Sequence, residues 1–231
     1  GQLQMVSEIP AHSETATFRN YDSLGHRLLE GYLLAGRLHG DNTGYYPEGP
    51  IRHKYQFKDG RRKGTNYRYY LNGQVETRET YSATGIDMKE ENFTEAGVRV
   101  SERNYRNNKP HGKWTQWQPD GKTPELTEEY ENGKLHGMRV TYHNNGKKAT
   151  EETWQFNLIT GEVRNYYENG ELEWKCMYRA SRMHGTYTAY HPGGSPRETG
   201  EYIANRKHGE WKEFDTSGNL LKTTLFRAGL L

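Results

Sequence analysis

A period of 24 residues runs through almost the whole chain and constrains its fold more than any other feature. Counted from Ala16, nine units follow one another, with one inserted residue in the fifth. Seven of the nine begin with glycine; the starts are Ala16, Gly40, Gly64, Met88, Gly112, Gly137, Gly161, Gly185 and Gly209. A period of this length predicts an array in which each unit packs mainly against its neighbours.

Three further positions of the unit repeat just as regularly. The sixth is always aromatic: Tyr21, Tyr45, Tyr69, Phe93, Trp117, Tyr142, Tyr166, Tyr190 and Phe214. The tenth is always glycine, from Gly25 to Gly218. The eighteenth is aromatic in all units but the first: Leu33, Phe57, Tyr81, Tyr105, Tyr130, Trp154, Tyr178, Tyr202 and Phe226. Because aromatic residues make up only 13% of the chain, these columns indicate a structural lattice.

The composition favours a folded chain with a thin core. Only 32% of the 231 residues are apolar, which alone would suggest disorder. Disordered chains, however, usually combine a high net charge with few aromatic residues. Here the net charge is +2 and the rings follow the period. We therefore expect aromatic side chains to replace the missing aliphatic interior.

Each unit contains two strand-like runs and two turn signals. In the unit that starts at Gly161, the sequence Glu168-Asn169-Gly170 separates two such runs, and Asn-Gly at this place favours a hairpin turn. A second turn signal precedes the glycine of the next unit, and no window has a helical period. We predict an all-β fold: an elongated, single-layer antiparallel meander of about nine 24-residue β-hairpin repeats over residues 16–231, after a lead-in segment at 1–15.

In this fold the sixth-position and eighteenth-position rings are expected to interleave on one face. Some units also carry a ring at the third position: Phe18, Trp114, Tyr187 and Trp211. Since the third and sixth positions differ by an odd number, strict alternation would place them on opposite faces. Either a bulge intervenes or both faces carry rings.

The pattern G-x-[WY]-x-x-[WY]-x-x-x-G, followed by Y-x-N-G-K-x-H-G, resembles MORN repeats. It is clearest at Gly112-Lys113-Trp114 through Glu131–Gly137, and again from Met183-His184-Gly185 to Trp211. The closer resemblance is to the variant in the bacterial YwqK-like family of antitoxins, over about residues 16–226. It departs from the pattern at Met88, at the extra residue near Thr123-Pro124 and before Gly40. The resemblance implies a hairpin array used for scaffolding and partner binding, contact with anionic lipid in some eukaryotic members, and no catalytic residues.

The residues themselves offer little support for catalysis or metal binding. Histidine closes five units, at His39, His111, His136, His184 and His208. Equivalent positions in adjacent hairpins lie about 10 Å apart, whereas two ligands of one zinc ion lie within about 4 Å of each other. The acid pairs Glu90-Glu91, Glu128-Glu129 and Glu151-Glu152 would point to opposite faces of a strand. We predict a protein that is not an enzyme and has no cofactor or metal site.

A basic column at position 22 of the unit is the most informative polar feature. Its members are Arg37, Arg61, Lys109, Lys134, Arg182 and Arg206. These cations are candidates for contact with an anionic lipid surface, although turn positions are ordinarily solvated and 30 acidic residues offset 32 basic ones. Without a dense basic cluster, nucleic acid is disfavoured as a partner.

Position 7 of the unit supplies candidates for protein binding: Tyr46, Tyr70, Tyr167, His143 and His191. Exposed tyrosines favour recognition because they bring a large area at low entropic cost. The alternative is that these side chains support the fold from the second face. We therefore predict a non-catalytic scaffold that binds a macromolecular partner, with protein favoured and docking on anionic lipid as the alternative.

The remaining expectations concern the ends of the chain, its cysteine and its location. The apolar run at 219–226 predicts self-association through an open edge strand. Cys176 excludes an internal disulfide and is expected to be a buried, inert thiol. No stretch approaches the roughly 18 apolar residues of a membrane span. The chain opens with Gly1 rather than Met, and an exported location is favoured over a cytoplasmic one.

Overall fold

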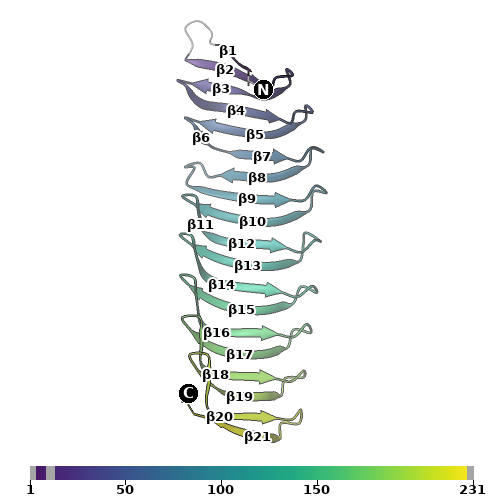
Figure 1. The fold of residues 1–231 in the computed structure, drawn as a ribbon, viewed down its shortest axis with the longest axis vertical. Coiled ribbons are helices and arrows are strands. Elements are labelled where there is room, and N and C mark those ends of the chain that lie inside the picture. The colour runs from purple at the N-terminus through teal and green to yellow at the C-terminus, as the bar shows by residue number, and fades with distance from the viewer. Residues whose placement is uncertain (1–3, 9–13, 228–231) are drawn as a thin grey trace. The chain divides into compact units, whose positions relative to one another are not determined.

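The computed structural model describes residues 4–8 and 14–227, and it contains strands and turns but no helix within those ranges (Figure 1). The contacts divide the chain into two compact units. The first comprises Gly1–Lys109 with Pro119–Gly121, and the second comprises Pro110–Gln118 with Lys122–Leu231. In each unit, strands that follow one another in sequence pair antiparallel, so the predicted all-β hairpin array is confirmed.

The first unit is an open sheet whose strands pair in chain order. They are β1 (Gln4–Glu8), β2 (Thr15–Tyr21), β3 (Arg27–Leu34), β4 (Arg37–Tyr45), β5 (Ile51–Lys58), β6 (Arg61–Arg62), β7 (Thr65–Tyr69), β8 (Val75–Tyr81), β9 (Asp87–Phe93) and β10 (Arg99–Arg106). The two-residue strand β6 continues into β7 after a break, and both pair with β5.

The second unit repeats the arrangement with longer strands. They are β12 (Gly112–Trp117), β13 (Pro124–Glu131), β14 (Lys134–Tyr142), β15 (Lys148–Gln155), β16 (Leu158–Tyr166), β17 (Leu172–Arg179), β18 (Arg182–Tyr190), β19 (Pro196–Ile203), β20 (Arg206–Phe214) and β21 (Leu220–Phe226). A two-residue strand, β11 (Lys109–Pro110), lies where the two ranges meet.

Two kinds of turn alternate along the array. The first turn contains the tenth-position glycine in a left-handed conformation, as at Gly170 (φ 88°), whose N–H donates to Tyr167 O at 2.8 Å. The second turn has two residues with positive φ, as at Phe156 (φ 51°) and Asn157 (φ 70°). Two positive-φ residues are what a tight hairpin turn of right-handed twist requires.

A register shift recurs at the sixth position of the unit. In β18 and β19, Ala189 pairs with Glu198 but Tyr190 pairs with Pro196, so Arg197 is the extra residue. Because the extra residue lies on the second strand, the first strand keeps its alternation. Both possibilities left open by the sequence therefore occur: a bulge is present, and rings lie on both faces.

The densest ring cluster lies in the second unit. Trp211 is 2% exposed and contacts three rings, with centroid distances of 5.4 Å to Tyr187, 5.0 Å to Tyr202 and 6.2 Å to Phe226. These rings come from the third and eighteenth positions. The interleaving expected of the sixth and eighteenth columns is thus made here by the third and eighteenth, because the bulge brings those two columns to one face.

The sixth-position rings serve the opposite face. The hydroxyl of Tyr166 donates to Glu151, and burial together with this carboxylate raises the pKa of Tyr166 to about 12. Tyr45 donates to Glu30 in the same relation. Tyrosine supplies both ring area and a hydrogen bond at these positions, which suits a thin sheet.

In the first unit, polar side chains occupy part of the interior. Thr77 Oγ1 donates to Asn92 Oδ1 at 3.0 Å, and Asn92 Nδ2 donates to Ser101 Oγ at 3.1 Å. The carboxylate of Glu91 is nearly buried and lies 2.7 Å from Arg78 Nε. A satisfied polar network of this kind fixes strand register, because a slip would leave its members unpaired.

Gly200 tests the ring packing. A Cβ at this position would lie 2.3 Å from two atoms of the Trp211 ring, and no positive φ is involved. We expect Gly200→Ala to lower the free energy of unfolding by about 1–3 kcal/mol, as overpacking does. Urea unfolding measures the loss, with the exposed neighbour Glu201→Ala as control. An equal loss in both variants would show that the contact does not constrain the fold.

Candidate functional site

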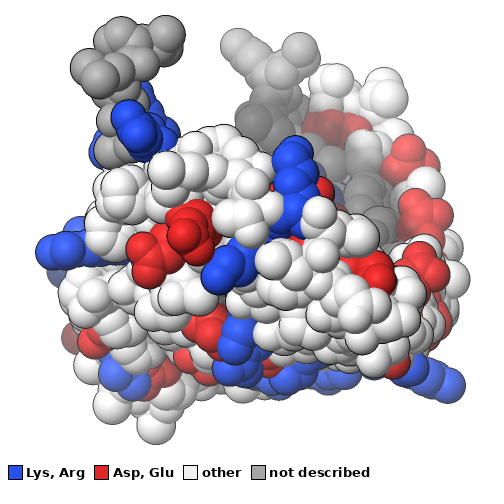
Figure 2. Space-filling view, turned by 90° about the horizontal axis from the view of Figure 1, so that it is seen from below, with Lys and Arg blue, Asp and Glu red and all other residues white. Residues whose placement is uncertain are grey.

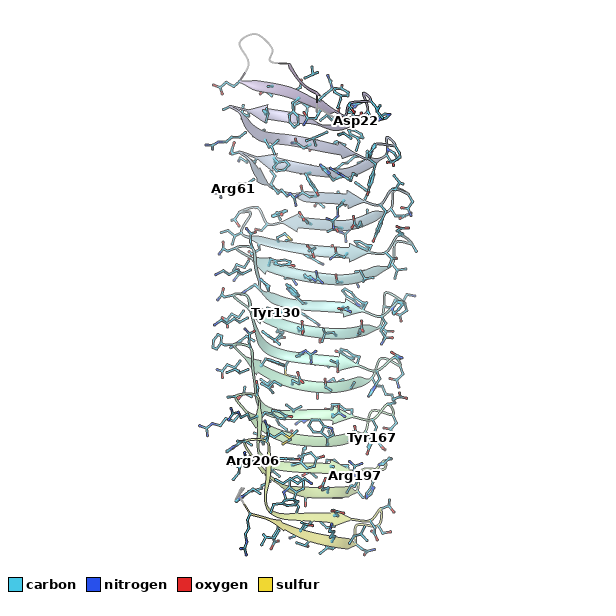
Figure 3. The ribbon with its side chains drawn as sticks, viewed as in Figure 1. Asp22, Arg61, Tyr130, Tyr167, Arg197 and Arg206 are labelled. Atoms are coloured by element: carbon cyan, nitrogen blue, oxygen red, sulfur yellow. The ribbon has the colours of Figure 1, made fainter. Side chains whose placement is uncertain are left out.

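Each unit has two edges at which residues of successive repeats line up. The first-turn edge is formed by the turns that contain the tenth-position glycine, and the second-turn edge by the two-residue turns. In the first unit Figure 3 shows Asp22 at the first-turn edge and Arg61 at the second-turn edge. In the second unit it shows Tyr167 and Arg206 at the corresponding opposite edges.

At the first-turn edge, seventh-position side chains bond to the backbone of the next repeat. Each places a side-chain polar atom on the carbonyl oxygen of a residue 23 positions ahead. The pairs are Tyr46 Oη to Tyr69 O (2.7 Å), Tyr70 Oη to Phe93 O (2.9 Å), His143 Nε2 to Tyr166 O (2.8 Å), Tyr167 Oη to Tyr190 O (2.7 Å) and His191 Nε2 to Phe214 O (3.0 Å). These are the five residues predicted to contact a partner.

The structure thus gives these five side chains a common role within the array. Their rings are half-buried and their polar tips are committed to the next repeat. Gln118 makes a related bond to the next repeat, since its Nε2 donates to the carbonyl oxygen of His143, 25 positions ahead, at 2.9 Å. The sequence contained the signal, because Gln118 is also a seventh-position residue. It was missed because the column was identified by its aromatic and histidine members alone.

The second-turn edge is held together by reciprocal hydrogen bonds between successive turns. Asn157 N donates to Leu135 O at 2.9 Å, and Leu135 N donates to Asn157 Oδ1 at 2.8 Å. The same exchange joins Met183 to Asn205, at 3.0 and 2.7 Å. A short polar side chain in the left-handed region can make such a bond, which explains asparagine at this turn position.

The basic column lies along this second edge. All six predicted cations are exposed, and within residues 4–8 and 14–227 none of them forms an ion pair. Lys134 Nζ lies 5.8 Å from the centre of the Phe156 ring. The column members are Arg37, Arg61, Lys109, Lys134, Arg182 and Arg206.

Cations within the sheet behave differently. Arg139 lies 3.1 Å from both Glu128 and Glu152, and Arg62 lies 2.7 Å from Glu79. On the side of the molecule that Figure 2 shows, acidic and basic side chains are interspersed. The six cations of the basic column open the strands that follow the two-residue turns. Arg37 lies opposite Leu34, Arg182 opposite Arg179 and Arg206 opposite Ile203, and none of these partners is a carboxylate.

Exposed apolar side chains share the second-turn edge, and sequence reasoning did not identify them as a surface. Phe156 is 52% exposed and Leu158 is 48% exposed. Leu158 occupies the position that is basic in most other units. This apolar exception was the feature of the sequence that could have indicated the surface. The turn places these two side chains between Lys134 of the preceding turn and Arg182 of the following one, because bonds at Leu135–Asn157 and Ile159–Ser181 stack the three turns.

The groups considered for chemistry are dispersed. Within each acid pair the neighbours have different partners: Glu91 binds Arg78, whereas Glu90 faces Arg103 at 3.4 Å. No group of three metal-ligating side chains occurs among the residues described. Cys176 is buried, as predicted, and burial raises the pKa of its thiol to about 11.

Four of the histidines at the last position of the units lie with their rings partly enclosed by protein. The Nδ1 atoms of His39, His111, His136 and His208 are enclosed by protein without a hydrogen-bond partner in the described part of the chain. The His136 ring also packs against Phe156 at a centroid distance of 4.6 Å. In the portion of the chain that the structure describes, no helix has the length and apolar character of a membrane span.

Comparison with known proteins identifies the repeats. The MORN repeat variant family model matches four stretches: 62–83, 159–179, 183–204 and 207–228. These matches support a MORN-repeat protein, with three of the four in the C-terminal part of the chain. No curated protein matches the chain.

Two solved structures match the chain with low structural similarity. One is described as TcdB2-TccC3 without its hypervariable C-terminal region, with 14% identity and a TM-score of 0.24; the match covers 90% of this chain and 12% of that one. The other is the Photorhabdus luminescens Tc holotoxin pore, with 8% identity and a TM-score of 0.22, covering 92% of this chain and 15% of that one. The present chain therefore spans a small part of the length of either.

Tyr167→Phe tests the inter-repeat bonds at the first-turn edge. The substitution removes the bond to Tyr190 O and leaves the ring in place, so we expect unfolding to become easier by about 0.5–1.5 kcal/mol. Tyr142→Phe is the matched control, since its hydroxyl makes no hydrogen bond within the described residues. Chemical denaturation of both variants checks this. The bond contributes nothing if the two variants unfold at the same denaturant concentration.

Proposed function

We propose that this protein is a non-catalytic repeat scaffold that binds a protein partner along its second-turn edge. The proposal rests on one observation: cations without an ion-pair partner lie next to exposed apolar side chains on that edge. MORN repeats are in general repeat modules for binding, which supports the scaffold role. An antitoxin-like role, as in the YwqK-like family, rests on sequence resemblance alone.

The chemistry of the second-turn edge fits a protein surface. Interface centres are enriched in aromatic residues and arginine, and a half-exposed phenylalanine is a suitable anchor. Phe156 and Leu158 provide the apolar centre, and Lys134 and Arg182 flank it. The arrangement favours a partner segment that carries an apolar side chain between acidic ones.

The seventh-position residues fit a partner surface less well. The polar tips of Tyr46, Tyr70 and Tyr167 already bond to the next repeat, so only their ring surfaces are available to a partner. The same holds for His143 and His191. We keep these five as a secondary part of the proposed interface.

Docking on an anionic lipid surface is the alternative function. It is favoured by the lack of ion pairs along the basic column, because free cations attract anionic headgroups at about 1 kcal/mol each near the surface. It predicts binding that weakens steeply with salt, whereas a contact centred on Phe156 would be less sensitive to salt.

Two sets of substitutions separate the functions. Phe156→Ser with Leu158→Ser should abolish recovery of a specific protein that co-purifies from the native host, and should leave liposome sedimentation unchanged. Arg37, Arg61, Arg182 and Arg206, all changed to Glu, should abolish salt-sensitive sedimentation with acidic liposomes if lipid is the ligand. Arg197→Glu is the control, since this exposed cation lies at the first-turn side (Figure 3).

The outcomes are distinct. Retention of the same co-purifying protein by the Phe156→Ser, Leu158→Ser variant would refute the proposed interface. Intact sedimentation of the fourfold variant would show that the basic column is irrelevant to lipid. Loss of either activity in the Arg197→Glu control would point to a general charge effect.

Self-association through β21 is a further part of the proposal. Leu220, Leu221 and Leu225 are 55%, 66% and 62% exposed, and β21 pairs with β20 as its one partner strand among the described residues. An apolar edge strand can pair with a second copy. We expect light scattering to show a mass that rises with concentration, and Leu225→Lys to reduce the rise. A monomeric mass at high concentration would refute this contact.

A further inference from the structure

An open depression of about 420 Å³ lies on the second-turn edge of the first unit. It extends along three successive second turns, from Arg37 through the segment 58–63 to the turn at 83–85. Five of its nine lining residues are cations, and one is an acid, Asp59. The cations are Arg37, Lys58, Arg61, Arg62 and Lys63.

The depression occurs where the stacking of turns is interrupted. Gly60 N donates to Leu38 O at 2.8 Å and thereby joins the first two of these turns. The next turn is longer, and Ser82 N closes it on Asp87 O at 2.9 Å. Among the described residues, no backbone bond joins residues 82–85 to Arg61 or Arg62. The missing link and the break between β6 and β7 leave room beside the basic segment.

One of the five cations is held rigidly. Arg62 Nη1 lies 3.0 and 2.7 Å from the two carboxylate oxygens of Glu79. Its guanidinium carbon also lies 4.0 Å from the centre of the Tyr55 ring. Arg62 is thus a fixed part of the wall, and Glu79 offsets its charge.

The other four cations are free to bind. Arg37, Lys58, Arg61 and Lys63 are all exposed, and none of them has an ion-pair partner within the structure's described ranges. The carboxylate of Asp59 lies 3.7 Å from His39 Nδ1. Four unpaired cations outnumber the one acidic residue of the lining, Asp59, and an excess of cations in a hollow creates a positive potential that concentrates anions.

We propose that this depression binds the phosphate groups of a multiply charged anion. Guanidinium groups present a planar fork that matches phosphate oxygens, and lysine ammonium groups act as point charges on the same ligand. Four unpaired cations around one hollow favour a ligand with several negative charges over a single carboxylate. The site is independent of the proposed protein interface, since Phe156 and Leu158 belong to the second unit.

The test measures binding of inorganic triphosphate to the full chain by calorimetry at low salt. We expect saturable binding, and a loss of at least about tenfold in affinity for the double variant Lys58→Gln, Arg61→Gln. The matched control is Arg179→Gln, Arg197→Gln, which removes two exposed cations of the other unit that lie outside the basic column and have no ion-pair partner among the described residues. It should bind as the unchanged protein does. Circular dichroism confirms that both variants are folded.

A second arm identifies the source of the phosphate. Vesicles of phosphatidylcholine with one-fifth phosphatidic acid are sedimented with the same three proteins. If the Lys58, Arg61 variant loses triphosphate binding, the result supports a soluble anion. If the same variant loses vesicle binding, the result supports a lipid headgroup. The proposal is overturned if neither ligand binds, or if the variant and its control bind both ligands equally.

Discussion

Hydrogen bonds between one repeat and the next are the interaction on which the rest of this structure depends. A thin sheet cannot rely on a thick apolar interior to fix how its hairpins follow one another. Here the seventh-position side chain reaches a carbonyl 23 residues ahead, and the second turns exchange bonds at a spacing of 22 residues. Each bond contributes only about 0.5–1.5 kcal/mol, but such bonds recur along the array and at both edges join each repeat to the next one.

The two edges differ in what these bonds leave available. At the first-turn edge, the bonds use the polar ends of the side chains themselves, as at Tyr167 and His191. At the second-turn edge, backbone groups and a short asparagine or serine side chain make the links, as at Asn157 and Ser181. The polar ends of the long side chains at the second turns, such as Arg37 and Arg182, therefore take no part in these links, and both proposed binding surfaces lie among them.

Much of the fold follows from the sequence, because the period is set by backbone requirements. Glycine at the tenth position is needed for the left-handed turn residue, and the strands between turns have room for one or two rings per face. The sequence did not predict which two columns of rings share a face of the sheet. That depends on the extra residue Arg197 in β19, which shifts the register of Tyr202 relative to β18, and the spacing of the rings within β18 carries no sign of that shift. The role of the seventh position could not be predicted either. A tyrosine that contacts a partner and a tyrosine that donates to a carbonyl of the next repeat are the same residue type in the sequence.

The sequence predicted the basic column, because the spacing of the charged residues is visible in it. It did not predict the depression, because that depends on the length of one turn. The basic column was evident from its spacing, yet whether a cation is paired depends on what the neighbouring strand presents. Arg139 and Arg37 are the same residue type with opposite outcomes, since Arg139 has carboxylates on both flanking strands. Arg37 opens β4 directly after a two-residue turn, and its partner on β3 is Leu34, which offers no carboxylate. The depression beside Arg61 adds a second requirement, a gap in the stacking of turns, and the longer turn at 82–87 provides it. A repeat array can therefore gain a local binding site by lengthening one turn, while every other repeat keeps its register.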